Sequence, residues 1–331
     1  MNTQVEQPPR TKVLFALAIV YVIWGSTYLG IRFAIESFPP FTMAGIRYLV
    51  AGLLMYGFAR PTVRVGPSRI EWRDATIIGG SLLVCGNGGI TFAEQYLPSG
   101  LVALLVTTLP VYMTLFAWWI GISNRPNYKV FVALFIGIIG VLILTSARKS
   151  SEASWNPGVV VPLIASAIWA AGSLFAKRAA KPSSANLSIG MQMIAGGVIL
   201  LCLGLGFGEW ARIRPELITI KSIVSLLYLV VFGSIIAFSA YVWLVRSCSP
   251  ALVGTYAFVN PVVAVFLGWM FAGETIDLRM IIGSVVILVA VGLIILFPVP
   301  YRNSPSPAAF EREQAYRRKE ESGPIVSDLK T

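Results

Sequence analysis

The stretch PSGLVALLVTTLPVYMTLFAWW, residues 98–119, recurs as SPALVGTYAFVNPVVAVFLGWM at residues 249–270. At this offset Pro110 lies over Pro261 and Trp118 lies over Trp269. A chance similarity between two apolar segments would not keep both prolines and tryptophans in register. The two stretches therefore indicate an internal duplication, which is the feature to establish before any other.

Other segments extend the match in the same order. IWGSTY (23–28) recurs as IWAAGS (168–173), and AGIRYLVAG (44–52) falls on IGMQMIAGG (189–197) without a gap. Near the ends of the two halves, GVLILTS (140–146) matches GLIILFP (292–298). The duplication thus covers most of the chain.

The composition predicts a membrane protein. Hydrophobic residues make up 56% of the chain, charged residues only 12%, and the mean hydropathy is +0.76, whereas about 25% of residues are charged in an average soluble protein. The charges are bunched, and between them lie ten apolar runs, each long enough for the roughly 17–25 residues of a membrane-spanning helix. We therefore predict an all-α polytopic membrane protein with ten transmembrane helices.

Five spans fall in each half, and five is an odd number. The second half therefore enters the membrane from the side opposite to the first, which makes the halves inverted repeats. Secondary transporters are often built this way, with their sites near the midplane between the repeats. The predicted boundaries are an N-terminal tail (1–12), a first repeat (13–147), a second repeat (148–300) and a C-terminal tail (301–331), which is polar enough to be disordered.

Counting Lys and Arg predicts that both termini are cytoplasmic. With the N-terminus inside, 18 basic residues fall on the cytoplasmic side and 7 on the outer side, as the positive-inside rule requires. The net charge of +11 is then a topology signal, and no nucleic-acid partner is needed to explain it. The first apolar run is flanked as a true span, and no small-residue cleavage motif follows it.

Arg47 interrupts the apolar run from residue 41 to residue 59. An arginine at the centre of a membrane helix costs roughly 2.5–3.5 kcal/mol on insertion scales, so something must offset that cost. In the repeat alignment Arg47 lies over Gln192, which suggests that the two are the outer and inner parts of one polar pathway. The alternative is that Arg47 snorkels or belongs to a structural ion pair, for example with Glu94 near the outer end of the third helix.

Further polar and aromatic residues lie inside the predicted spans, where they either pack or line a cavity. The candidates for a substrate pathway are Trp24, Ser26, Thr27, Tyr28, Asn87, Trp169, Ser173, Tyr256 and Asn260. Pro110 and Pro261 lie near the centres of the fourth and ninth spans, where each removes a backbone hydrogen bond. They are either structural kinks or hinges that bend during gating.

The missing residue types exclude several functions. The chain has no histidine, so HExxH metal sites and Ser-His pairs are ruled out. It has no phosphate-binding loop, so we expect no direct use of ATP and no cofactor, and the three unpatterned cysteines (Cys85, Cys202 and Cys248) are expected to pack rather than to form disulfides. Glu94 is the only carboxylate placed to carry protons for ion coupling. An enzyme is therefore not expected.

Three segments together resemble the EamA family of the drug/metabolite transporter superfamily, in particular its ten-helix bacterial inner-membrane exporters. They are IWGSTYLGIRFAIESFPPFTMAGIRYLVAG (23–52), GNGGITFAEQYLPSG (86–100) and YAFVNPVVAVFLGWMFAGE (256–274). The resemblance covers about residues 15–297 and implies two EamA domains, a central cavity open alternately to each side, and export of small metabolites, amino acids or drugs. In one departure, Gly273 and Glu274 correspond to Ile122 and Ser123 in the first repeat, which lacks that carboxylate.

The leading hypothesis is therefore a secondary transporter of the bacterial cytoplasmic membrane. Its expected partners are a small organic solute and membrane lipid, and a monomer is compatible with it. Trp24, Trp169 and Tyr256 suit a bulky, partly apolar solute, whereas the planar fork of Arg47 suits a carboxylate or phosphate. The rivals are a nucleotide-sugar or sugar-phosphate carrier of the same superfamily, and a non-transporting membrane scaffold.

Overall fold

A computed structural model describes residues 9–96, 102, 105–146, 160–272 and 277–297 of the chain. The predicted tail at 301–331, most of the tail at 1–12, and Glu274 lie outside the described residues. Within these ranges the chain is helical and contains no strand. Six helical stretches are long and apolar enough to cross a membrane: Arg10–Ile35, Pro40–Thr62, Arg69–Ala93, Val160–Arg178, Ala185–Gly206 and Ile220–Ser247. Three shorter apolar helical stretches accompany them: Tyr128–Ile143, Pro250–Ala264 and Ile281–Leu296.

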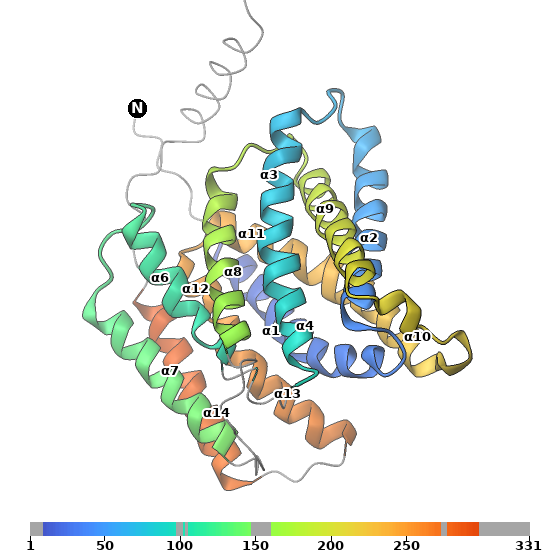
Figure 1. Ribbon diagram of the computed structural model, residues 1–331. Coiled ribbons are helices and arrows are strands. Elements are labelled where there is room, and N and C mark those ends of the chain that lie inside the picture. The colour runs from blue at the N-terminus through green and yellow to red at the C-terminus, as the bar shows by residue number, and fades with distance from the viewer. Residues whose placement is uncertain (1–8, 97–101, 103–104, 147–159, 273–276, 298–331) are drawn as a thin grey trace, which may run out of the picture.

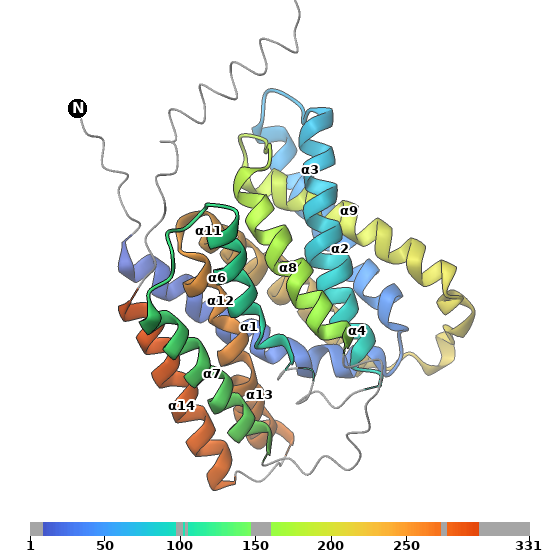
Figure 2. The ribbon, with the colours of Figure 1, turned by 60° about the vertical axis from the view of Figure 1, so that its left-hand side comes forward.

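Figures 1 and 2 show the helices of the described chain. The first half contains α1 (Arg10–Ile35), α2 (Pro40–Ala59), η1 (Arg60–Thr62), α3 (Arg69–Gly79), the π-helical segment η2 (Gly80–Gly88), α4 (Gly89–Ala93), α6 (Leu109–Trp119) and α7 (Tyr128–Ser146). The second half contains α8 (Val160–Arg178), α9 (Ala185–Gly206), η4 (Glu209–Arg212), η5 (Pro215–Leu217), α10 (Ile220–Tyr228), the π-helical segment η6 (Leu229–Ile236), α11 (Ala237–Ser247), α12 (Pro250–Gly254), α13 (Tyr256–Ala272) and α14 (Leu278–Leu296).

Helices from the two halves pair with one another. α2 packs along α9, and α7 packs along α14 at one edge of the bundle (Figures 1 and 2). α1 contacts α10, α11 and α13, while α8 contacts α3, α4 and α6. The core therefore lies between the halves and not inside either one.

Glycines allow α2 and α9 to approach backbone to backbone. A Cβ placed on Gly52 would lie 2.6 Å from the amide nitrogen of Ile194 and 2.9 Å from the carbonyl oxygen of Gly190. A Cβ on Gly190 would lie 2.7 Å from the amide nitrogen of Tyr56. Small residues at membrane helix interfaces serve this purpose, because packing drives association where lipid and side chains are equally apolar.

The fourth and ninth spans are interrupted, although not at the predicted prolines. A turn at Thr107 and Thr108 precedes α6, so Pro110 lies in the first turn of a helix, where its missing N–H has no helical partner to lose. The ninth span breaks at Thr255, between α12 and α13, while Pro261 lies inside α13. A gating role for the two prolines stays a prediction.

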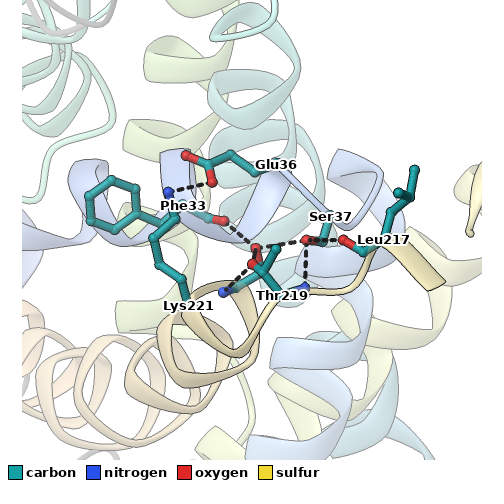
Figure 3. Close-up of polar contacts among 7 residues, drawn as sticks. Phe33, Glu36, Ser37, Leu217, Thr219 and Lys221 are labelled. Carbon is teal, nitrogen blue, oxygen red and sulfur yellow. Dashed lines mark hydrogen bonds and ion pairs between the residues drawn. The ribbon is translucent and has the colours of Figure 1, made fainter. Parts of the chain in front are cut away.

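A polar cluster fastens the end of α1 to the start of α10 (Figure 3). Ser222 Oγ donates to the carbonyl oxygen of Phe33 at 2.7 Å and accepts from Ser37 Oγ at 2.9 Å. Lys221 pairs with Glu36 and lies over the Phe33 ring at 4.5 Å. The first helix of one half is thereby tied to the third helix of the other.

A second tie joins the end of α8 to α3. The backbone N–H of Ala180 donates to Asp74 Oδ2 at 2.8 Å, and Arg73 Nε donates to Asp74 Oδ1 at 2.9 Å. Asp74 is buried, which is tolerable because its carboxylate is both hydrogen-bonded and paired. This tie again joins the first helix of one half to the third helix of the other.

Candidate functional site

A cavity lies where the two halves meet, and it is called the central cavity below. Eight of the eleven residues predicted for the substrate pathway line it: Trp24, Thr27, Tyr28, Arg47, Asn87, Trp169, Tyr256 and Asn260. The rest of the lining is Ile31, Tyr48, Ile90, Val106, Leu109, Ser166, Gly233 and Phe238. The structure thus brings together side chains from both halves that are far apart in the sequence.

Arg47 is held inside this cavity by groups other than the predicted carboxylate. Its side chain is 2% exposed, and Nε donates to Ser234 Oγ at 2.8 Å. The guanidinium carbon lies 4.8 Å from the centre of the Tyr48 ring, a cation–π contact. Within the described part of the chain no ion pair joins Arg47 to Glu94, so the charge is not neutralised by the protein there.

The two π-helical segments supply key parts of the lining. Trp24 Nε1 donates to the carbonyl oxygen of Gly233 at 3.1 Å. A Cβ on Gly233 would lie 2.7 Å from Arg47 Nη2 and 3.0 Å from Thr27 Cγ2, so a glycine leaves the room that the arginine occupies. Gly233 belongs to η6 and Asn87 to η2. π-helical turns frequently mark functional sites, and here both face one cavity.

Four buried polar atoms of the central cavity have no hydrogen-bond partner in the protein: Arg47 Nη1, Asn87 Oδ1, Ser166 Oγ and Asn260 Oδ1. Among the described residues only two other buried side-chain atoms share this property, Glu94 Oε1 and Gln192 Oε1. Leaving a buried donor or acceptor unpaired costs about 1–3 kcal/mol, so native proteins rarely do so without a reason. Their concentration in one cavity leaves donors and acceptors there that water or a polar guest can bind.

Four aromatic rings close one end of the central cavity, and they are called the aromatic cluster below. Trp24 lies 5.6 Å from Trp169, 5.0 Å from Tyr241 and 4.9 Å from Tyr256 between ring centroids. Trp169 Nε1 donates to the Tyr241 hydroxyl at 2.7 Å, and that hydroxyl also bonds Ser173 Oγ at 2.6 Å. Buried Trp and Tyr polar atoms usually need such partners, so the cluster is locked in place.

A second cavity has Tyr241 in its lining. Its lining includes two of the three remaining predicted residues, Ser173 and Gln192, together with Ser188, Lys181 and Arg246. Gln192 Nε2 donates to Ser188 Oγ at 3.2 Å, while its Oε1 is unpaired. Arg47 and Gln192, equivalent in the repeat alignment, therefore lie in different cavities.

The other predicted residues lie outside both linings. Ser26 Oγ donates to the carbonyl oxygen of Ile23 and bonds the Tyr228 hydroxyl, so it fastens α1 to α10. Glu94, Pro110 and Pro261 line neither cavity. Five further residues at these sites were not predicted from the sequence: Tyr48, Ser166, Gly233, Ser234 and Tyr241. The available signal for Tyr241 was a tyrosine inside the uncharged run between Lys221 and Arg246. Its equivalent in the repeat alignment is the apolar Ile90, so the repeat did not mark it as a polar position.

Replacing Tyr241 by phenylalanine should destabilise the protein, since the change leaves the buried Trp169 Nε1 without an acceptor. The expected loss is about 1–3 kcal/mol of unfolding free energy, seen as a fall of a few degrees in the apparent melting temperature in detergent. Tyr112→Phe is the matched control, because no hydrogen bond of the Tyr112 hydroxyl is present within the described chain, and its ring makes apolar contacts, among them one with Phe116 at 5.7 Å between centroids. Equal melting temperatures for the two variants would contradict this role of Tyr241.

Comparison with known proteins concerns the family and the fold of the chain. Residues 11–146 and 156–296 each match the EamA-like transporter family. The "Uncharacterized inner membrane transporter YedA" of Escherichia coli (strain K12) is 40% identical over 282 residues, covering 85% of this chain and 90% of the relative. The "Probable amino-acid metabolite efflux pump" of Salmonella typhimurium is 28% identical over 285 residues, covering 83% and 91%. A crystal structure that is 15% identical superposes with a TM-score of 0.68 over 87% of this chain and 98% of the other, and this similarity concerns the fold alone.

Proposed function

Because the chain belongs to the EamA-like transporter family, we propose that it is a secondary transporter exporting amino-acid-like solutes with bulky apolar side chains. The family places it among multi-pass inner-membrane transporters, which act on a small molecule in a lipid environment. The four unpaired polar atoms gathered in the central cavity carry the more specific proposal. As proposed, the protein catalyses no chemical reaction and uses no ATP.

The proposed architecture has ten spans in two inverted five-helix repeats. The family match falls twice, once in each half, and the helix pairs are related in the way that inversion requires. α1 contacts α13 as α8 contacts α6, and α1 contacts α10 and α11 as α8 contacts α3 and α4. Gly52 and Gly190 meet at the α2–α9 contact, and in the repeat alignment Gly52 corresponds to Gly197 and Gly190 corresponds to Gly45. A pseudo-twofold axis between α2 and α9 accounts for all of these observations.

In this proposal the N- and C-termini are cytoplasmic, following the distribution of Lys and Arg. The second cavity then faces the cytoplasm, and the central cavity lies toward the outer half of the bilayer. The aromatic cluster separates the two. Alternating access would open one cavity and then the other as the polar ties at Ser222 and at Asp74 are made and broken in turn.

The central cavity is chemically matched to a zwitterion. Arg47 Nη1 is a free charged donor for a carboxylate, and the guanidinium fork favours that group. Asn87 Oδ1 and Asn260 Oδ1 are free acceptors for an ammonium group, and the faces of Trp24 and Trp169 suit an apolar side chain. The Salmonella relative named for amino-acid metabolite efflux supports the same class.

The rival carriers fit the central cavity less well. A phosphate or nucleotide sugar brings more than one negative charge, whereas Arg47 is the only charged residue that lines this cavity in the described chain. In a scaffold that moves no solute, four unpaired buried polar atoms would lower the stability of the fold without a functional benefit. A transported zwitterion makes use of all of them.

The test is counterflow in proteoliposomes loaded with unlabelled solute. We expect saturable exchange of phenylalanine, and at least tenfold slower exchange of its decarboxylated analogue phenethylamine and of a sugar phosphate. Exchange of the sugar phosphate alone would favour the rival carrier. No counterflow for any solute would overturn the transporter proposal and favour the scaffold.

A further inference from the structure

The second cavity has two cationic side chains in its lining and no acidic one. Lys181 follows α8 and Arg246 lies near the end of α11, and the polar residues between them are Ser173, Ser188 and Gln192. No carboxylate is among its lining residues in the described chain. The cavity therefore carries a positive potential in a place that is partly shielded from water.

The two cations are not neutralised by neighbouring groups. Lys181 Nζ donates only to the carbonyl oxygen of Ala176, at 3.1 Å, and Arg246 has no hydrogen bond or ion pair to a described residue. Burial and the nearby positive charge of Arg246 lower the pKa of Lys181 to about 8. Asp74, the acid adjacent to the lining residue Ala75, is already engaged by Arg73 and Ala180. An anion placed in this cavity would relieve the repulsion between the two cations.

The deeper wall of this cavity leads toward the central cavity. Gln192 is 2% exposed and its Oε1 is unpaired, so a donor of the guest can bind there. Beyond it, Tyr241 and Ser173 line this cavity and bond Trp169, which lines the central one. A solute that enters at Lys181 would meet the aromatic cluster next.

We infer that the second cavity is a cytoplasmic loading site in which Lys181 and Arg246 bind the carboxylate of the solute before it passes to Arg47. The inference rests on the proposed function for the identity of the solute. A carboxylate of the solute and a phosphate of an anionic lipid share the required chemistry. Of the two, we assign the solute, because the cavity continues inward to Gln192 and Tyr241.

The first test measures binding without transport. With its lowered pKa, Lys181 should react with an amine-directed reagent at pH 7.5, and mass spectrometry would follow the modification. We expect phenylalanine to protect Lys181 at least fivefold and phenethylamine not to protect it, in mixed micelles of neutral lipid. Protection by phosphatidylglycerol alone would assign the site to lipid and overturn the inference, as would no protection by any of the three.

The second test compares transport from the cytoplasmic face with transport from the outer face. In proteoliposomes of known orientation, Lys181→Gln and Arg246→Gln should each raise the KM for phenylalanine at the cytoplasmic face about tenfold, the loss expected for one charge-assisted hydrogen bond. The KM at the outer face should stay unchanged. Arg64→Gln is the control: it removes one charge from the same predicted face, and Arg64 lines neither cavity. If wild type exchanges phenylalanine but the variants match the control, the loading site is wrong while the transporter proposal stands.

Discussion

Arg47→Gln should reduce counterflow of phenylalanine by about a hundredfold or more while leaving the protein folded. The cavity offers no other cation in the described lining, so the variant would bury the carboxylate of the solute without a charged partner. Breaking a buried ion pair in this way costs about 3–5 kcal/mol, which corresponds to a factor of at least a hundred. Counterflow at matched protein density in the vesicles would measure the effect.

Although Arg47→Gln should lower transport activity, it should not lower the stability of the protein. In the absence of solute Arg47 is a buried cation with an unpaired Nη1, and its presence in the bilayer costs roughly 2.5–3.5 kcal/mol. Removing the charge should therefore leave the apparent melting temperature in detergent unchanged or raise it. A structural role would instead lower the melting temperature together with activity, and that result would contradict the assignment of Arg47 to the substrate site.

Arg47→Lys separates charge from geometry. Lysine keeps the positive charge but lacks the planar fork that binds a carboxylate through two parallel bonds. In the wild type, Nε of Arg47 donates to Ser234 while Nη1 is available to the solute. The single Nζ of a lysine cannot occupy both of these positions. We expect about a tenfold loss of exchange, between wild type and the glutamine variant. Full activity of the lysine variant would show that only the charge matters.

The family and the class of fold could be predicted from the sequence because a bilayer imposes strong rules. Backbone groups in lipid must be paired internally and charges there are costly, so apolar runs mark helices in a way that soluble sequences do not. The family prediction is confirmed, as is the prediction of a helical multi-pass membrane protein. Six stretches of the described chain are long enough to span, and the full count of ten stays a proposal.

The detailed architecture of the site could not be predicted, for physical reasons. Hydropathy does not distinguish α-helical from π-helical turns, so nothing in the runs around Asn87 and Gly233 revealed η2 and η6. Charge complementarity suggested Glu94 as the partner of Arg47. The hydrogen-bond partner of Arg47 is instead Ser234, which is 187 residues away in the sequence. A single serine among many cannot be recognised as such a partner from the sequence. The fourth span breaks just before Pro110, because a proline in the first turn of a helix is already satisfied. The ninth span breaks at Thr255, while Pro261 lies inside α13.

Gly52→Leu should disrupt the α2–α9 contact and lower the apparent melting temperature by several degrees. The first added carbon would already lie 2.6 Å from the amide nitrogen of Ile194 and 2.9 Å from the carbonyl oxygen of Gly190. Backbone atoms cannot rotate aside as a side chain does, so the two helices must separate. Overpacking typically costs about 1–3 kcal/mol and occasionally more. Each kcal/mol shifts the melting temperature by about 2–4 °C for proteins of roughly 150–250 residues, and by less for a longer chain such as this one.

The chain supplies its own control on the same helix. A Cβ on Gly57 would meet nothing within 4 Å, so Gly57→Leu makes the same chemical change on α2 and should leave the melting temperature nearly unaltered. Gly190→Leu should match Gly52→Leu, since the two glycines lie on opposite sides of one contact, and combining them should cost less than the sum of the single changes because the helices have already moved apart. Two results would show that the helices do not meet at these glycines: additive losses in the double variant, or a Gly52→Leu variant as stable as Gly57→Leu. The proposed pseudo-twofold axis between α2 and α9 would then lose its closest contact.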